Sequence, residues 1–216
     1  MTMNYQEIHT PLGGEEIAIE MAWVDMETTG LSTKEGDVPL EVGCILTDWD
    51  GNEAVTFKSL IVPRNWEMEL ANAKPIVQEM HRKNGLASDL REVCAAMGER
   101  KAEEKLSFGE VDNEMFKFLD QFGDGPSVMP MCGSTINFDR DFMTFLPNSL
   151  SWFHYRNIDV STVMNLCRGL NKSIHDQCPG FPADKKAHRV LADIRDSIKL
   201  YKFYKDNFLF TAGEVD

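Results

Sequence analysis

The order of strand-like and helix-like stretches does most to constrain how this chain can fold. Its first half carries three strand-like stretches with short connections, at 17–27, 39–47 and 55–62. Asp50-Gly51-Asn52, between the second and third, has the composition of a tight turn. Short connections leave no room for a crossover, so these strands are expected to pair antiparallel.

The pattern then changes to alternating helices and strands. Pro147 is expected to end the helix 139–145, and Ser161 is expected to cap the helix 162–169. The expected elements are helices at 67–83, 86–105 and 111–122, a strand at 127–134, a helix at 139–145, a strand at 155–160, a helix at 162–169, a loop at 171–187 and a helix at 189–206. We therefore expect an α/β fold in which an antiparallel meander and later βαβ units share one mixed sheet flanked by helices.

Length and composition are those of a globular protein. With 216 residues and 43% hydrophobic content, the chain suits one domain spanning 1–216, with 1–16 as a flexible extension and 209–216 as a flexible tail. It has no apolar run of the ~20 residues that span a membrane, and its start is too polar and acidic for a signal peptide. The five cysteines form no C-x-x-C pair, which argues against a disulfide framework or a zinc cluster. These features predict a cytoplasmic protein without membrane contact.

The net charge of −13 limits the ligands that the chain can bind. Sequence-independent binding of long nucleic acids depends on many Lys and Arg contacts to phosphates, which so acidic a chain does not favour. A short nucleic acid held by metal ions and a few local cations remains compatible with this charge.

Two acidic residues stand at the expected end of the first strand, in WVDMETTG. Residues i and i+2 of a strand face the same side, so Asp25 and Glu27 are expected to point together. Like charges this close raise each other's pKa unless a cation compensates them. By itself this pair also fits a solvated strand end.

Further candidates lie where helices are expected to begin. Asp139 follows the strand 127–134, and Asp193 lies near the start of the last helix. Functional groups gather at such positions in open α/β sheets. His188 precedes Asp193 by five residues, about 140° around a helix. It can face the same site if it lies at or before the first turn; otherwise it is a surface histidine.

Together these residues resemble the DEDDh-type 3′-to-5′ exonucleases, which have the ribonuclease H-like fold. Within that group the chain is most similar to oligoribonuclease, over roughly residues 19–208. The motifs that carry this resemblance are D-x-E at 25–27, Met131-Cys132-Gly133, Asp139-Arg140, FHYRNIDVST at 153–162 and HRVLADIRDS at 188–197.

The resemblance implies a metal-dependent reaction. Asp25, Glu27, Asp139 and Asp193 would hold two Mg²⁺ or Mn²⁺ ions, hard cations that prefer oxygen ligands. His188 would take a proton from the attacking water. The implied activity is 3′-to-5′ hydrolysis of short single-stranded oligoribonucleotides to nucleoside 5′-monophosphates.

Other roles follow from the resemblance alone. The candidates for substrate contacts are Leu31, as an apolar wedge, and Ser134, Tyr155, Arg156 and Ser161. Tyr155 also fits edge-strand packing, and Ser161 also fits simple helix capping. The cations near the site in sequence are interpreted as solvated: Arg140, Lys185, Lys186 and Arg189. A homodimer is implied, with the FHYR segment near its interface.

Three departures from the oligoribonuclease pattern keep other functions open. Thr28 stands where these enzymes usually have Met, Ser134-Thr135 stands where they have Asn-Ser, and Ile76 stands where a base-stacking Trp is expected. Thr28 is more typical of ribonuclease T or a proofreading exonuclease, so a 3′-to-5′ DNA exonuclease is one alternative. A non-catalytic nucleic-acid-binding relative is the other.

Overall fold

One mixed sheet organises the described part of the chain. The computed structural model describes residues 18–179 and 189–209. Within them the sheet has five strands in the order β3-β2-β1-β4-β5. Neighbours pair antiparallel from β1 to β3, and β4 and β5 join parallel to β1. In chain order the strands are β1 (Met21–Thr28), β2 (Pro39–Thr47), β3 (Glu53–Leu60), β4 (Pro130–Gly133) and β5 (His154–Asp159).

The predicted α/β fold is confirmed, with its antiparallel meander followed by parallel strands. The turn between β2 and β3 forms as predicted, because Gly51 adopts a left-handed φ of 72° and the Asn52 amide donates to Asp48 Oδ1 at 2.8 Å. The predicted extension 1–16, and the tail 209–216 apart from Leu209, lie outside the described residues.

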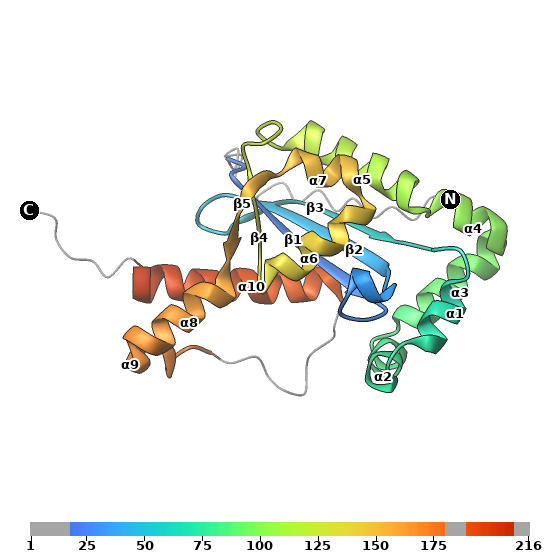
Figure 1. Cartoon of the computed structure of the whole chain (residues 1–216). Coiled ribbons are helices and arrows are strands. Elements are labelled where there is room, and N and C mark those ends of the chain that lie inside the picture. The colour runs from blue at the N-terminus through green and yellow to red at the C-terminus, as the bar shows by residue number, and fades with distance from the viewer. Residues whose placement is uncertain (1–17, 180–188, 210–216) are drawn as a thin grey trace, which may run out of the picture.

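Helices cover both faces and one end of the sheet (Figure 1). The α-helices are α1 (Trp66–Asn72), α2 (Pro75–Lys83), α3 (Leu86–Met97), α4 (Glu99–Lys105), α5 (Phe108–Phe122), α6 (Ile136–Phe142), α7 (Pro147–Trp152), α8 (Val160–Leu170), α9 (Lys172–His175) and α10 (Val190–Tyr204). The short 3₁₀ and π segments are η1 (Thr33–Glu35), η2 (Met143–Phe145) and η3 (Lys205–Leu209). None of the helices within the described residues has the length and apolar character that crossing a membrane requires.

Several predicted helix boundaries were wrong for local reasons. The helix expected at 67–83 is two helices, because Lys74 takes the extended conformation (ψ 143°) favoured before proline and Pro75 starts α2. The helix expected at 86–105 breaks at Gly98, whose φ is 82°. Pro147 does not end a helix but begins α7.

The predicted cap of α8 was also wrong. Asp159 is the N-cap, and its carboxylate accepts a hydrogen bond from the backbone N–H of Ser161. Ser161 is therefore inside the first turn. The loop expected at 171–187 contains α9, and residues 180–188 lie outside the described part.

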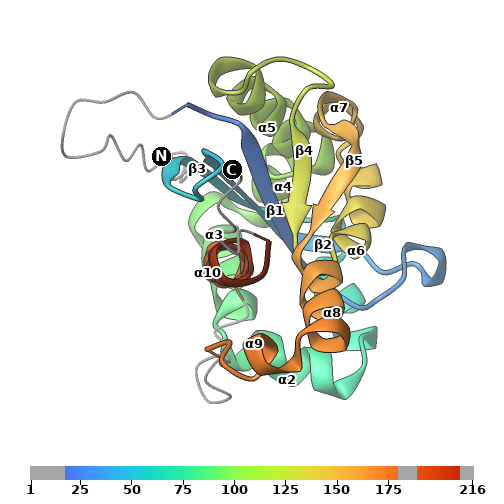
Figure 2. The same cartoon turned by 90° about the vertical axis from the view of Figure 1, so that its left-hand side faces the viewer.

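The side chains of β1 alternate between two apolar layers. Ala22, Val24 and Met26 pack in the layer formed with α5, α6 and α7. Met21 and Trp23 pack in the opposite layer, with α8 and α10. Figure 2 shows α10 and α5 on opposite sides of the sheet. The odd-numbered side chains of β1 thus face α10, which decides where the acidic residues of this strand point.

Candidate active site

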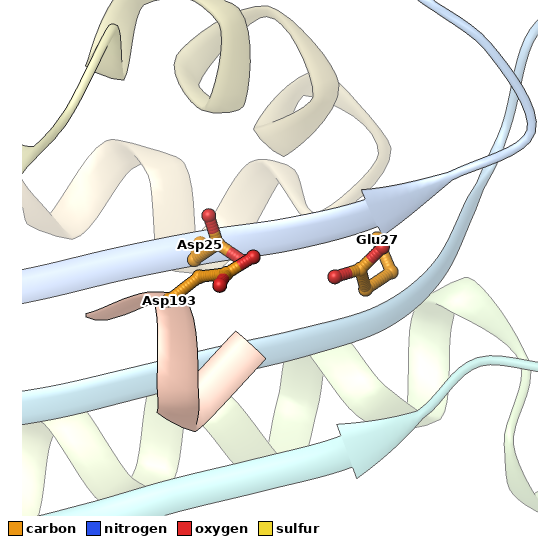
Figure 3. Close-up of side chains that lie close together, drawn as sticks. All are labelled: Asp25, Glu27 and Asp193. Carbon is orange, nitrogen blue, oxygen red and sulfur yellow. The ribbon is translucent and has the colours of Figure 1, made fainter. Parts of the chain in front are cut away.

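The two acidic residues of β1 continue the odd-numbered face of the strand. Met21 and Trp23 are buried against α8 and α10, and Asp25 and Glu27 follow on the same side, toward the C-terminal end. Figure 3 shows their carboxylates with that of Asp193, from the first turn of α10. The apolar half of β1 anchors the strand, and its acidic half faces the start of α10.

A glycine on β2 lets α10 approach the sheet closely. Gly43 pairs with Asp25 in the ladder, so it also faces α10. A Cβ on Gly43 would lie 2.7 Å from Val190 Cγ2 and 3.3 Å from Ile194 Cδ1, which is too close for an ordinary contact. The close approach of this part of α10 brings the side chain of Asp193 to the strand.

Asp25, Glu27 and Asp193, here called the acidic cluster, can offer oxygen atoms to a single cation. One ligand atom of each lies within 4.8 Å of those of the other two, a grouping found among the described residues. Carboxylate oxygens are the ligands that Mg²⁺ and Mn²⁺ prefer. The chemistry of this donor set therefore fits a hard divalent cation.

Asp139 borders the acidic cluster from the other layer. It lies on α6 and is buried, and its Oδ1 accepts a hydrogen bond of 3.0 Å from the backbone N–H of Met26. The parallel pairing of β4 with β1 involves Ala22 and Trp23, before the strand reaches Met26. Asp139 thus binds the backbone of β1 between the positions of the two acidic residues.

Burial and mutual repulsion raise the pKa values of these carboxyl groups. The pKa of Asp25 lies well above its ordinary value, because of burial and then the charges of Asp139 and Glu27. Burial and the charge of Asp193 raise the pKa of Glu27 to about 9, and burial raises that of Asp139 to about 8. Negative charge at this place is costly without a compensating cation.

Glu41 differs from Glu27 although the two face each other in the β1–β2 ladder. Its side chain is completely buried and pairs with Lys58 (3.2 Å) and with Arg189, whose Nη2 lies 2.7 Å away. Arg189 was interpreted as a solvated cation, which is wrong: its side chain is 19% exposed and spans the start of α10. The signal in the sequence that could have found this pair is Glu41, a charged residue within an otherwise apolar strand, because a buried carboxylate needs a cation as its partner.

Arg140 was also interpreted as solvated, and this too is wrong. It is partly buried and donates to Asn157 Oδ1 at 2.8 Å and to the backbone oxygen of His154 at 2.7 Å. It therefore joins α6 to β5.

His81 was missed in the sequence. It lies on α2 and is completely buried, with Nε2 2.8 Å from the backbone oxygen of Thr28 and Nδ1 3.8 Å from Glu27 Oε2. These contacts bind α2 to the acidic end of β1. Its spacing in the sequence gave no signal linking it to Glu27.

The predicted substrate contacts divide into two groups. The Ser197 hydroxyl, one turn after Asp193 on α10, donates to Ser134 Oγ at 2.9 Å. Asp159 Oδ1 accepts the backbone N–H groups of Thr135 and Ser161, each at 2.9 Å. The segments of Ser134 and Ser161 are thus brought together where β4 and β5 end.

Tyr155, Arg156 and Leu31 form the second group. The Arg156 guanidinium lies 5.2 Å from the ring centroid of Tyr155, on the edge strand β5. The Tyr155 side chain is 71% exposed, and Leu31, after β1, is 73% exposed. Both are available to a ligand. His188 lies outside the described residues, so its role as a base stays a prediction.

Comparison with solved structures defines the fold class. The structure of E. coli exonuclease I in complex with a dA16 oligonucleotide matches with a TM-score of 0.59 and 16% identity, over 89% of this chain and 42% of that chain. The exonuclease I of Methylocaldum szegediense matches with a TM-score of 0.56 and 18% identity, over 89% and 42%. The present chain thus spans about 42% of the length of these exonucleases. The fold is ribonuclease H-like, as predicted.

Curated relatives show the family. The mitochondrial oligoribonuclease of Bos taurus is 32% identical over 197 residues, covering 90% of this chain and 75% of that protein. The oligoribonuclease of Burkholderia lata is 34% identical over 199 residues, covering 91% and 87%, and that of a Neisseria meningitidis strain is 32% identical, covering 91% and 96%. No family profile matches the chain. The chain belongs to the oligoribonuclease family, and the predicted membership of the DEDDh-type 3′-to-5′ exonucleases is confirmed.

Proposed function

We propose that this chain is a metal-dependent 3′-to-5′ exonuclease that degrades short single-stranded oligoribonucleotides to nucleoside 5′-monophosphates. The observation that carries the proposal is the convergence of Asp25, Glu27 and Asp193 within 4.8 Å, in a member of the oligoribonuclease family. The net charge of −13 supports a short substrate, because so acidic a chain attracts long phosphate backbones weakly.

The acidic cluster, with Asp139, would hold two Mg²⁺ or Mn²⁺ ions. The raised pKa values of Asp25, Glu27 and Asp139 support this assignment, since bound cations would favour their ionised forms. When bound, such ions stabilise the negative charge that develops on the phosphate and lower the pKa of a bound water. Asp139 also holds the Met26 N–H, which keeps its carboxylate beside β1.

The other predicted residues bind substrate and move the proton. His188 accepts the proton of the attacking water, a role suited to its ordinary pKa of ~6.5. Ser134 and Ser161 hold a phosphate where β4 and β5 end, and Leu31, Tyr155 and Arg156 contact bases or backbone. The connection through Thr135 and Asp159 supports a common role for the two serines.

Assembly and location are further parts of the proposal. We infer a homodimer in which β5 and α8 lie near the interface. The exposed side chains of Tyr155 (71%), Leu166 (51%) and Leu170 (76%) support this choice. The cytoplasmic location stays a prediction, because the relatives include mitochondrial as well as bacterial proteins.

A DNA substrate is the second candidate. Thr28 and Ile76 depart from the oligoribonuclease pattern, and Ile76, at the position expected for a stacking Trp, is 76% exposed. A base can thus reach this position without meeting an aromatic ring. The non-catalytic alternative is less well supported, because Asp25, Glu27, Asp139 and Asp193 are all present.

The test compares labelled RNA and DNA of two to twenty nucleotides with Mn²⁺. We expect the highest kcat/KM for RNA of two to five nucleotides, and loss of hydrolysis in excess chelator or in Asp25→Asn, whose neutral amide is a weaker ligand. Asp141→Asn, which removes a charge from an exposed position of α6, is the control and should stay active. Full activity of Asp25→Asn would contradict the metal mechanism. Equal or better cleavage of twenty-nucleotide strands would replace the short-substrate assignment by a general exonuclease.

A further inference from the structure

A buried ion pair lies directly at the start of α10. Glu41 of β2 accepts hydrogen bonds from Arg189 Nε at 2.9 Å and Nη2 at 2.7 Å. The side chain of Glu41 is completely buried and that of Arg189 is 19% exposed. Two parallel N–H donors on one carboxylate fix the plane of the guanidinium as well as its distance. The pair therefore holds Arg189 in one orientation.

The same guanidinium reaches a third element. Arg189 Nη1 lies 2.8 Å from Asp89 Oδ2, on α3, and 3.5 Å from the backbone oxygen of Asn84. Arg189 is the N-cap of α10, with an extended backbone (φ −138°, ψ 133°). One side chain thus ties the beginning of α10 to both β2 and α3.

The backbone of Arg189 continues this connection to Asp193. The Asp193 N–H donates to the Arg189 carbonyl oxygen at 3.0 Å, which closes the first turn of α10. Glu41 lies opposite Glu27 in the β1–β2 ladder. The strand pair β1–β2 therefore carries both Glu27 and Glu41, and Glu41 holds the first turn of α10, on which Asp193 lies.

The energetics favour a role beyond stability. A buried ion pair gains little over well-packed apolar residues of similar size, because both charges lose their hydration. The two paired N–H donors also fix the orientation of the guanidinium on the carboxylate, which a single contact would not do. Arg189 also places a positive charge near a site that would bind cations, which by itself weakens their binding.

We propose that Arg189, held by Glu41, is a positioning residue that fixes the first turn of α10, so that the Asp193 carboxylate meets those of Asp25 and Glu27 to bind a divalent cation. This inference rests on the proposed metal-dependent function. A positioning role and a purely electrostatic role differ in what Arg189→Lys does, because this variant keeps the charge but loses the paired donors. It keeps the wild-type affinity for Mn²⁺ if only the charge matters, and binds Mn²⁺ more weakly if the position matters.

The test measures the Kd of Mn²⁺ for the metal-free protein by electron paramagnetic resonance, in wild type, Arg189→Gln, Arg189→Lys and Glu41→Gln. We expect Arg189→Gln to weaken binding about tenfold, as loss of a partner that orients a ligand commonly does. Arg189→Lys keeps the charge but not the paired donors, so it should recover part of the affinity. Faster hydrogen exchange in the first turn of α10, with the rest of the protein unchanged, should accompany the loss.

The matched control is Arg195→Gln. Arg195 is also on α10 and binds a glutamate of the sheet, with Nε and Nη2 each 3.0 Å from oxygens of Glu53 on β3. Arg195 lies two residues after Asp193 and is not at the start of the helix. Its replacement should therefore change the Kd of Mn²⁺ less than twofold. An equal loss of affinity in Arg189→Gln and Arg195→Gln would overturn the proposal.

Other outcomes are equally decisive. Unchanged or tighter Mn²⁺ binding by folded Arg189→Gln would overturn the positioning role. If Arg189→Gln does not fold, Arg189→Lys decides, because wild-type affinity in that variant would show that the paired geometry is not needed. Failure of the proposed function is a separate result: wild type would bind Mn²⁺ but hydrolyse no oligonucleotide.

Discussion

Glu27 and Glu41 offer a direct test of how the acidic cluster is held, because they face each other and are both buried. Glu41 pairs with Arg189 and Lys58. Glu27 lies among groups of its own charge: burial and Asp193, then Glu41, raise its pKa, and Arg189 opposes them. His81 Nδ1 is 3.8 Å away. Replacing each glutamate by glutamine should therefore change stability in opposite directions.

The magnitude follows from the pKa of Glu27. Its pKa rises from an ordinary 4.5 to about 9, so the folded metal-free protein binds more protons than the unfolded chain between these values. Stability then falls as the pH rises through this window. Since one pKa unit corresponds to about 1.4 kcal/mol, the interval from 4.5 to 7 corresponds to about 3.5 kcal/mol. Glu27→Gln cannot ionise and should remove up to about 3.5 kcal/mol of this penalty at pH 7.

The assay is urea unfolding in excess chelator at pH 4 and pH 8. Glu27→Gln should match wild type at pH 4 and exceed it at pH 8, where the penalty is larger. Glu41→Gln should lose about 3 kcal/mol at pH 8, because it breaks a buried ion pair. Adding Mn²⁺ should stabilise wild type more than Glu27→Gln. A Glu27→Gln protein less stable than wild type at pH 8, or stabilised equally at both pH values, would refute the reasoning.

Other substitutions test the approach of α10, the base and the substrate site. Gly43→Ala should push Val190 and the first turn of α10 from the sheet, costing about 1 to 3 kcal/mol in urea unfolding and lowering kcat/KM at least tenfold; wild-type values would show that the contact can relax. His188→Ala should lower kcat about 10²- to 10⁴-fold, with a smaller loss at higher pH as hydroxide becomes available; an unchanged kcat at neutral pH would make His188 structural. Ile76→Trp should add a stacking contact of about 1 to 3 kcal/mol and so raise kcat/KM for two-nucleotide RNA relative to kcat/KM for ten-nucleotide RNA. If this ratio is unchanged, the base binds elsewhere.

The predictable parts of the site are those that depend on local periodicity. Alternation along a strand was enough to place Asp25 and Glu27 on one side, and the structure has them on the face that packs against α10. Asp139 was correctly expected at the start of a helix that follows a strand. The helix boundaries were less predictable, because a glycine such as Gly98 can continue or break a helix, and a proline such as Pro147 can follow one helix or begin the next.

The remaining parts depend on contacts between distant segments. The Arg189–Glu41 pair joins residues 148 positions apart, and no local pattern distinguishes this arginine from a solvated one. Gly43 has the same character: the reason for its missing side chain is Val190, on a helix that begins almost 150 residues later. Two residues of β2 thus position the first turn of α10: Gly43 leaves space for Val190, and Glu41 binds Arg189. A substitution on β2 that leaves the acidic cluster itself intact can therefore still displace Asp193, and so alter cation binding.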